Sequence, residues 1–280
     1  MDRFKRIREI GGGGFGEAYL VERKTDGKKF VIKDIVTDTL DEQGIAFAQE
    51  EATKMQNLTH ANIVRYEDAW RDERDEHFYI LMEYCESGDL EDHIRRQVKE
   101  MEGCHFSEKK IVNWFGQICA ALKHCHDRNV LHRDIKAGNI FMTKDRKQVK
   151  LGDFGAARIL ELDTYGGVRA AKTVIGTVSH MAPEMWDRSG YTQAMDIWSL
   201  GVVLYQMCAL RAPFLPPPGV KDWTDSDWCQ AAKRGQYEPL PDFFSNQLKD
   251  VVAKCLTVNP NQRPNIDEVI ELVTDMQFDS

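Results

Sequence analysis

Hydrophobic and polar residues follow one pattern in the first part of the chain and another in the rest. Up to about Tyr84, short apolar runs such as residues 30–32 are bounded by turn-forming residues, which predicts β-strands, with one helical interruption over about residues 44–58. Beyond Gly88, apolar residues recur at every third or fourth position, most clearly over residues 111–126. The same period predicts further helices over residues 196–210, 224–234, 246–256 and 266–276. The pattern therefore predicts an α+β fold, with a small β-rich lobe followed by a larger helical lobe.

A glycine-rich stretch, IGGGGFGEAYL, occupies residues 10–20. Gly11, Gly13 and Gly16 fit the pattern G-x-G-x-x-G, which dinucleotide-binding folds share with protein kinases. In a dinucleotide-binding fold the glycines must open a helix, but residues 17–22 are rich in strand-forming side chains and precede a turn signal and another apolar run. We therefore expect a glycine loop between two strands, which could lie over a ligand as a flap. An ordinary surface turn is the alternative from these residues alone.

The composition limits the classes of partner. The chain has 280 residues, of which 42% are hydrophobic and 29% charged, and its formal net charge at pH 7 is -8. We expect no nucleic-acid partner, because that function needs a basic face, and no membrane partner, because no apolar run is long enough to span a bilayer. The seven cysteines are scattered and form no C-x-x-C pair, which favours a reducing, cytoplasmic location.

Lys33 ends the third predicted strand and is the first candidate for catalysis. A lysine that points from a strand into a cleft is costly unless it is paired. The predicted helix that follows offers Glu50 and Glu51 as partners. Taken alone, Lys33 would be an ordinary solvated lysine on a strand.

A second group of polar residues lies in the sequence HRDIKAGNIF, residues 132–141. Asp134 can accept a hydroxyl proton, Lys136 can neutralise a phosphoryl group, and the side-chain carbonyl of Asn139 can bind Mg²⁺, a hard cation that prefers oxygen. Asp153 follows the next predicted strand and offers another oxygen ligand. Each piece also has an ordinary structural explanation, since the sequence Asp-Phe-Gly is a common turn.

The order of these motifs along the chain is the protein kinase signature: a glycine loop, a strand lysine, a helix glutamate, H-R-D with an asparagine, D-F-G and A-P-E. The chain resembles a eukaryotic protein kinase over residues 4–276, and within that superfamily it resembles the NIMA-related (NEK) serine/threonine kinases. The resemblance is carried by MEYCESGDL at 82–90, LHRDIKAGNIFMT at 131–143, KLGDFGAARIL at 150–160 and DIWSLGVVLYQMCALRAPF at 196–214. The stretch NIVRYEDAW at 62–70 would also suit the kinases that phosphorylate the translation initiation factor eIF2, which are the alternative subfamily.

The resemblance implies a bilobal protein kinase fold, with an N-lobe over about 4–84, a hinge over about 83–88 and a C-lobe over about 89–276. It also implies an enzyme that transfers the γ-phosphate of ATP to Ser or Thr of protein substrates, with Mg²⁺, or Mn²⁺ in its place, as the metal. The residues expected around ATP are Ile10, Gly11, Gly12, Gly13, Gly14, Phe15, Gly16, Ala18, Val31, Lys33, Met82, Glu83, Cys85 and Phe141. Among them, Met82 would be the gatekeeper behind the adenine, and the backbone of Glu83 and Cys85 would bind the adenine edge.

The catalytic residues that the resemblance implies are Lys33, Glu51, Asp134 and Lys136, and the implied metal ligands are Asn139 and Asp153. The strand lysine would hold the α- and β-phosphates and pair with a helix glutamate, for which the spacing to the sequence HANIV favours Glu51 over Glu50. The aspartate of H-R-D would position the substrate hydroxyl and accept its proton, and the lysine two residues later would balance charge on the γ-phosphate. Asp196 would brace this loop from below.

Regulatory and structural roles are also implied. Glu184 and Arg263 would form a buried ion pair that anchors the activation segment. Thr173 lies where relatives carry the activating phosphate, which could pair with the planar guanidinium of Arg133; an unmodified surface threonine is the alternative. Thr177 would contact the catalytic loop, so we assign it a structural role.

Several residues depart from the family pattern. Ala18 stands where a valine usually covers the adenine, and Val31 stands where an alanine is usual. Val178 and His180 replace the common proline and tyrosine, which leaves the shape of the substrate groove open. No departure removes a catalytic group, so an active kinase is favoured over a pseudokinase that serves as a scaffold or nucleotide-binding module. The family also suggests cytoskeletal or cell-cycle partners and a nuclear, centrosomal or flagellar location besides the cytoplasm.

Overall fold

The computed structural model describes residues 3–13, 16–36, 58–72, 77–100, 103–154, 178–187, 192–220 and 223–278. The chain forms two compact units: Met1–Glu86 with Asp153–Ala171, called the sheet unit below, and Ser87–Gly152 with Lys172–Ser280, called the helical unit. The boundary between Glu86 and Ser87 falls inside the predicted hinge. Asp153 and Phe154, which the predicted C-lobe included, group with the sheet unit. Outside the described residues lie residues 44–57 of a predicted helix and the predicted site residues Gly14, Phe15, Glu51, Thr173 and Thr177.

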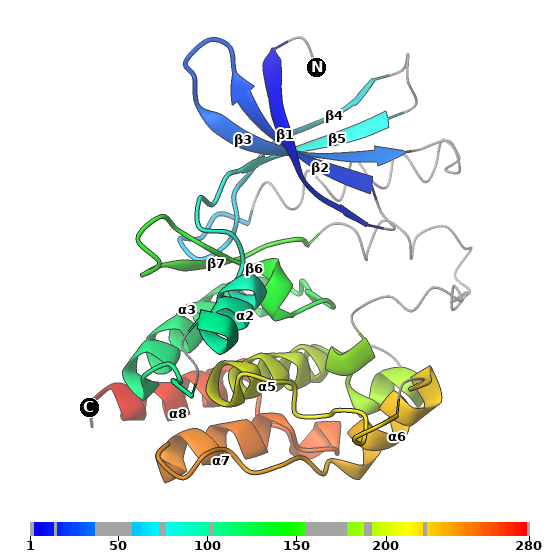
Figure 1. Cartoon of the computed structure of the whole chain (residues 1–280), viewed down its shortest axis with the longest axis vertical. Helices are drawn as coiled ribbons and strands as arrows, with labels where there is room; N and C mark the ends of the chain where they lie inside the picture. Colours follow the sequence, from blue (N-terminus) through cyan, green and yellow to red (C-terminus); the bar gives the residue numbers. More distant parts are fainter. Residues whose placement is uncertain are drawn as a thin grey trace. The chain divides into compact units, whose positions relative to one another are not determined.

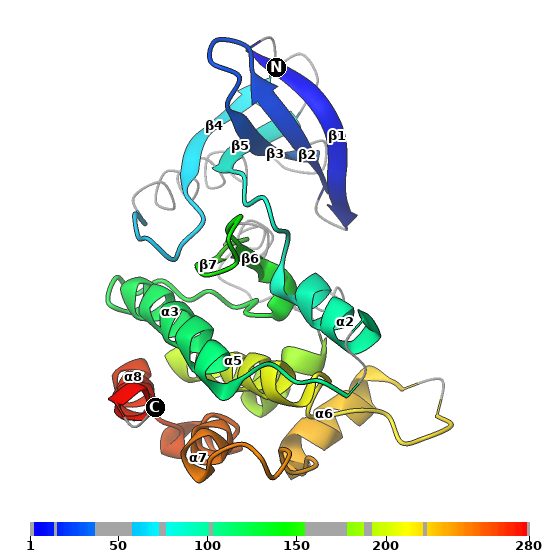
Figure 2. The ribbon, with the colours of Figure 1, turned by 60° about the vertical axis from the view of Figure 1, so that its left-hand side comes forward.

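The sheet unit is built on one five-stranded antiparallel sheet with the strand order β1-β2-β3-β5-β4 (Figures 1 and 2). Its strands are β1 (Phe4–Gly13), β2 (Gly16–Arg23), β3 (Lys29–Val36), β4 (Tyr66–Asp72) and β5 (His77–Glu83). Side chains alternate between the two faces of a strand. Every second side chain therefore lies on the same face of the sheet, next to the side chains of the neighbouring strands. The core that results contains Phe4, Tyr19, Val21, Phe30, Ile32, Tyr79 and Leu81.

The glycine-rich stretch forms a β-hairpin. Strands β1 and β2 pair from Phe4 and Arg23 to Gly13 and Gly16, so two glycines form the last pair of the hairpin. The next turn contains Gly27, whose φ of 69° is readily adopted by glycine. The predicted arrangement of strand, glycine loop and strand is confirmed, and the dinucleotide-binding alternative is wrong because no helix follows these glycines.

The helical unit contains α2 (Leu90–Glu100), α3 (Glu108–His126), α5 (Gln193–Ala209), α6 (Asp225–Arg234), α7 (Asn246–Cys255) and α8 (Ile266–Phe278). A small sheet pairs β6 (Ile140–Met142) with β7 (Val149–Leu151). The predicted helices are present with bounds that differ by a few residues. Helix α5 ends at Ala209 because Leu210 adopts a left-handed conformation, with a φ of 57°. No helix in the described part of the chain is long and apolar enough to cross a membrane.

Helix α5 is the central element of the helical unit. It packs against α3 and α7, and its residues Trp198 and Tyr205 are completely buried. At Gly201 the packing leaves no room for a side chain, because a Cβ placed there would lie 2.6 Å from the Cβ of Cys255 in α7. This close packing fixes the helix that carries Asp196, a residue on which the catalytic loop depends.

Candidate active site

Two charged residues of the sheet unit, Lys33 and Asp153, form an ion pair. Lys33 lies in β3, in register with Ala18 of β2 and Ile80 of β5. Its Nζ lies 2.6 Å from Oδ1 of Asp153, and the two side chains are 15% and 32% exposed. Asp153 has a φ of 58°, which is uncommon for a residue other than glycine and marks a strained backbone of the kind found at functional sites. Within the described residues, therefore, the lysine pairs with Asp153; the expected partner, Glu51, lies outside them.

A tyrosine that the sequence did not single out holds the residue after Asp153. The backbone N–H of Phe154 donates to the hydroxyl of Tyr66 in β4 at 3.2 Å, and both side chains are buried. A buried hydrogen bond of this kind contributes about 1 kcal/mol of stability. Strand β4 therefore helps to fix the direction of the chain where it leaves Asp153.

The residues of the sheet unit that were predicted to surround ATP lie on or next to its strands. They are Ile10, Gly11, Gly12 and Gly13 of β1, Gly16 and Ala18 of β2, Val31 of β3, Met82 and Glu83 of β5, and Cys85 just beyond. Val31 and Met82 are register partners on neighbouring strands, so their backbones lie side by side. The N–H of Glu83 donates to the carbonyl of Arg65 at 2.9 Å. This N–H is used within the unit, so it is not the group that would bind adenine.

Phe141, the remaining predicted ATP-binding residue, belongs to the helical unit. It lies in β6, where it bridges to Asp89. The N–H of Met142 donates to the carbonyl of Gly88 at 2.8 Å, and the N–H of Ser87 donates to the carbonyl of Met142 at 3.2 Å. Strand β6 is thus bound to the segment that opens the helical unit.

The catalytic-loop candidates come together around Asp134. The Nζ of Lys136 lies 2.8 Å from Oδ2 of Asp134. The amide nitrogen of Asn139 donates to the same Oδ2 and to the backbone carbonyl of Asp134, each at 2.8 Å. The contacts of the carboxylate within the described residues use Oδ2, so Oδ1 is left for an incoming hydroxyl. The structure therefore brings together the three residues that the sequence proposed for this loop.

The buried carboxylate of Asp196, near the start of α5, binds the backbone of this loop. It accepts from the N–H of His132 at 3.0 Å and from the N–H of Arg133 at 2.9 Å, and it contacts the Nε2 of His126 at 2.9 Å. Arg133 has a φ of 69°, a strained conformation that these bonds hold in place. The bracing role expected for Asp196 has this geometric basis.

His132 links the loop to the end of β7. Its Nδ1 accepts from the N–H of Asp134 at 3.3 Å, so its Nε2 carries the hydrogen and donates to the carbonyl of Gly152 at 3.0 Å. The side chain is buried. A single neutral imidazole therefore connects Asp134 with Gly152, the residue just before Asp153.

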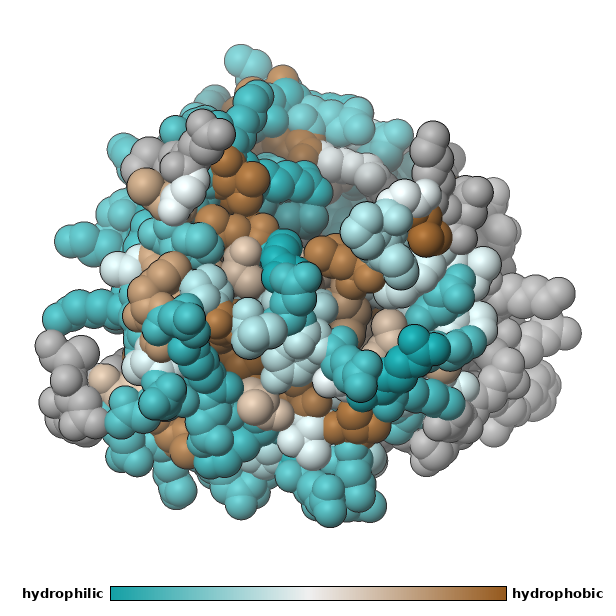
Figure 3. Space-filling view, turned by 60° about the horizontal axis from the view of Figure 1, so that its bottom comes forward, coloured by the Kyte–Doolittle hydropathy of each residue, from teal (hydrophilic) through white to brown (hydrophobic). Residues whose placement is uncertain are grey.

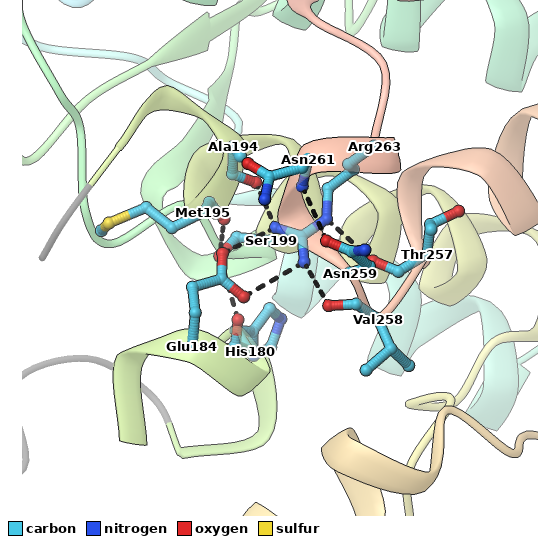
Figure 4. Close-up of polar contacts among 10 residues, drawn as sticks. All are labelled: His180, Glu184, Ala194, Met195, Ser199, Thr257, Val258, Asn259, Asn261 and Arg263. Carbon is cyan, nitrogen blue, oxygen red and sulfur yellow. Dashed lines mark hydrogen bonds and ion pairs between the residues drawn. The ribbon is translucent and has the colours of Figure 1, made fainter. Parts of the chain in front are cut away.

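Arg263 and Glu184 form the expected ion pair, which Figure 4 shows at the centre of a larger network. Two nitrogens of the guanidinium meet the two carboxylate oxygens at 2.8 and 3.1 Å. The same guanidinium donates to the carbonyls of Ala194, Thr257 and Val258. The side chain of Arg263 is completely buried and that of Glu184 is 10% exposed. Because every charge is matched, the pair can remain buried without the penalty of an isolated ion.

His180, which stands where a tyrosine is common, is buried against α5. Its Nδ1 lies 3.0 Å from the hydroxyl of Ser179, and its Nε2 lies 3.0 Å from Oε1 of Gln206. Its backbone carbonyl accepts from the hydroxyl of Ser199 at 2.9 Å. Burial lowers the pKa of His180 below its usual range. The segment Val178–His180 is therefore attached to α5 by a neutral histidine, and this departure from the family pattern has a structural role.

The two predicted metal ligands fit a hard divalent cation. Asn139 uses its amide nitrogen for both bonds to Asp134, which leaves Oδ1 to act as a ligand. Asp153 offers a partly exposed carboxylate whose Oδ1 already contacts the cationic Nζ of Lys33. Carbonyl and carboxylate oxygens are the ligands that Mg²⁺ prefers. The two ligands belong to different units of the chain.

The chain is similar to known proteins over nearly its whole length. Residues 4–273 match the protein kinase domain family. The chain is 37% identical to serine/threonine-protein kinase Nek1 of Mus musculus over 271 residues, which cover 97% of this chain and 21% of that protein. It is 38% identical to Nek5 of Homo sapiens, over 97% of this chain and 36% of that protein. For Nek2 of Homo sapiens the identity is 37%, over 99% of this chain and 61% of that protein.

The chain thus spans between about a fifth and about three fifths of the length of these relatives. The match to the protein kinase domain family covers almost the whole chain. The relatives named here are all serine/threonine-protein kinases. The chain therefore belongs to the protein kinase family, and within it is similar to the NIMA-related serine/threonine kinases.

Proposed function

We propose that this domain transfers the γ-phosphate of Mg-ATP to the hydroxyl of Ser or Thr in protein substrates. The observation that carries the proposal is the arrangement of Asp134, with Lys136 and Asn139 on one carboxylate oxygen and the other oxygen left for a substrate. A pseudokinase that only binds nucleotide or serves as a scaffold would not need this arrangement.

In the proposed reaction, Oδ1 of Asp134 orients the substrate hydroxyl and accepts its proton as the oxygen attacks. Lys136, which contacts Oδ2 in the free domain, balances the charge of the transferred phosphoryl group. Asp196 keeps the loop backbone in position throughout, because its bonds do not involve the reacting groups. Positioning of this kind, together with electrostatic stabilisation, supplies almost all of the catalysis in phosphoryl transfer.

Residues implied by the resemblance would hold the nucleotide and the metal. Lys33 would contact the α- and β-phosphates, and Asn139 and Asp153 would supply oxygen ligands to Mg²⁺. When bound, Mg²⁺ neutralises charge that develops on the phosphates. The ion pair of Lys33 and Asp153 is partly exposed. Lys33 can therefore exchange Asp153 for the phosphates, and Asp153 can exchange Lys33 for the metal, without leaving an unpaired buried charge.

A phosphate-transfer assay with Mg-ATP and casein as a generic acceptor tests the proposal. We expect wild type to incorporate phosphate into Ser and Thr, and Asp134→Asn to lower kcat by roughly 10²- to 10⁴-fold, the usual contribution of a general base. Asp242→Asn, which changes a fully exposed carboxylate, is the matched control and should be as active as wild type. If wild type incorporates no more phosphate than Asp134→Asn, the pseudokinase alternative is favoured.

We also propose control by autophosphorylation of Thr173, on the resemblance alone. A phosphate adds a charge of roughly -1.5 to -2 at neutral pH and could pair with Arg133, which lies in the catalytic loop next to Asp134. Intact mass and initial rates should be compared for wild type, a phosphatase-treated sample and Thr173→Ala. Equal rates in all three, or no phosphate on Thr173 after incubation with Mg-ATP, would contradict this mode of control.

A cytoplasmic location is a further proposal, and its support is that all seven cysteines are free thiols. Cytoskeletal or cell-cycle partners, and a nuclear, centrosomal or flagellar location, rest on the resemblance only. Imaging of the fluorescently tagged protein in its own cells tests the location.

A further inference from the structure

The loop between α5 and α6 contains an exposed stretch that the catalytic function does not use. Its sequence is LPPPGV, residues 215–220, here called the proline turn. Leu215 and Val220 are 45% and 44% exposed, and Pro217, Pro218 and Gly219 are exposed as well. In Figure 2 the yellow loop that joins α5 to α6 extends away from the helices at the lower right.

Covalent geometry gives the first half of the proline turn an extended form. Each proline has a φ near -65°. Leu215, Pro216 and Pro217 each precede a proline, which disfavours the α-helical region of the backbone for all three. Pro216 and Pro217 are under both restrictions, which favour the polyproline II conformation, an extended form without internal hydrogen bonds.

The second half is a tight turn. The N–H of Val220 donates to the carbonyl of Pro217 at 3.1 Å, and Gly219 has a φ of 87°. With Pro218 and Gly219 in its central positions, this is a type II turn with the residues that such a turn prefers. The turn places the exposed side chain of Val220 immediately after the prolines.

Aromatic contacts hold the chain on both sides of the proline turn. Phe214, just before it, is buried and stacks on Trp198, with ring centroids 5.6 Å apart. Trp223, a few residues after it, packs against Trp228 of α6 at 4.6 Å. A ligand held at both ends loses little conformational freedom when it binds, so a short contact can still be useful.

Large hydrophobic side chains are rarely exposed among the described residues, and Leu215 and Val220 are two of those that are. On the face of the molecule in Figure 3, hydrophobic residues form small groups between hydrophilic ones. Exposed apolar side chains on a preformed proline helix instead suit a partner with a narrow groove of aromatic rings, into which proline rings and a neighbouring apolar side chain fit.

We propose that the proline turn is a docking ligand for a proline-recognition domain with an aromatic-lined groove. The prolines supply the rigid helix, and Leu215 and Val220 supply an apolar side chain at each end. The contact is small and therefore weak, as befits a transient partner of an enzyme.

The test is a titration of ¹⁵N-labelled SH3, WW, EVH1 and GYF domains, in separate samples, with the unlabelled whole chain. We expect at least one of these domains to lose signal intensity at its aromatic groove as the chain is added. Replacing Pro216 and Pro217 together by alanine, which keeps Pro218 and Gly219 at the centre of the tight turn, should weaken that binding by about tenfold or more. Val220→Ser should weaken it in the same direction. Pro239→Ala, at another exposed proline, is the matched control and should bind as wild type does.

Equal melting temperatures for all variants would show that each one folds. The proposal is overturned if none of the four domains responds, or if the proline variants bind as well as wild type. It is also overturned if sedimentation of the chain alone reveals self-association that Val220→Ser abolishes, because the proline turn would then bind a second copy. None of these outcomes depends on kinase activity, so the proposal stands or falls separately from the proposed function.

Discussion

The two units hold the residues proposed for catalysis in different ways. In the sheet unit, Lys33 and Asp153 are partly exposed and are paired with each other. In the helical unit, Asp134 belongs to a loop whose backbone is bound by the buried carboxylate of Asp196. A partly exposed ion pair can change partners at small cost, whereas breaking a buried network leaves polar groups unsatisfied. The charges of the sheet unit are thus suited to meet a ligand, and the loop of the helical unit is built to stay in place.

The largest effect on stability should come from the most deeply buried ion of the helical unit. Arg263→Met would remove the guanidinium that donates to the carboxylate of Glu184 and to three backbone carbonyls. Breaking a buried ion pair from one side costs about 3–5 kcal/mol, which urea unfolding would measure. Arg95→Met removes the exposed partner of Glu91 and is the control, with an expected loss below about 1 kcal/mol. Equal losses in the two variants would contradict the distinction between buried and exposed pairs.

Features set by neighbouring residues could be predicted from the sequence. The glycine hairpin followed from strand-forming residues on both sides of Gly13 and Gly16, and its register confirms it. The ion pair of Glu184 and Arg263 was expected from the resemblance, and the two side chains do meet. Helix α2 received no predicted bounds, because its sequence LEDHIRRQVKE is mostly polar and only Leu90, His93 and Ile94 are buried.

Features set by distant residues could not be predicted. Tyr66 looks like any aromatic residue of a strand. Nothing in the neighbouring sequence indicates that its hydroxyl accepts from the backbone of Phe154, 88 residues later. Asp153 follows a strand of the helical unit in sequence, and nothing local indicates that its carboxylate contacts Lys33, 120 residues earlier in the chain. Such contacts depend on the packed structure, and a single sequence does not encode them in any local pattern.

Lys33→Met should separate activity from stability in the sheet unit. Loss of one charged group that binds the phosphates should lower kcat/KM for ATP by roughly 10²- to 10³-fold, as removal of one electrostatic donor does in other enzymes. The melting temperature should change little, because the pair with Asp153 is partly exposed. Lys29→Met, at an exposed position of the same strand, is the control. A variant with normal turnover would show that Lys33 does not bind the phosphates.

Asp196→Asn should affect both properties in the helical unit. The two oxygens of Asp196 accept from the N–H groups of His132 and Arg133, whereas an asparagine side chain has only one oxygen. One of these two N–H groups would therefore lose its partner. We expect a loss of about 1–3 kcal/mol and, because the loop shifts, a fall in kcat of roughly 10- to 100-fold. Hydrogen exchange should become faster at these two amides. Asp267→Asn, at an exposed ion pair with Lys123, should leave both exchange and kcat unchanged. Unchanged exchange in Asp196→Asn would contradict the bracing role.

The smallest predicted effect concerns pH and again lies in the helical unit. His93 is buried, stacks on Phe106 with ring centroids 5.3 Å apart, and its Nε2 has no partner among the described residues. Burial, together with the nearby charges of Lys110, Arg146 and Arg96, lowers the pKa of His93 from 6.5 to about 4. Between these two values the unfolded chain takes up a proton that the folded chain resists, so this histidine makes the fold less stable as the pH falls from about 6.5 toward 4.

His93→Phe keeps an aromatic ring in the stack but does not titrate. The urea midpoint of wild type should therefore drop more than that of His93→Phe between pH 7 and pH 5, while the two should respond alike to pH above 7. If the two proteins lose stability equally on acidification, the buried histidine does not contribute to the acid sensitivity of the helical unit.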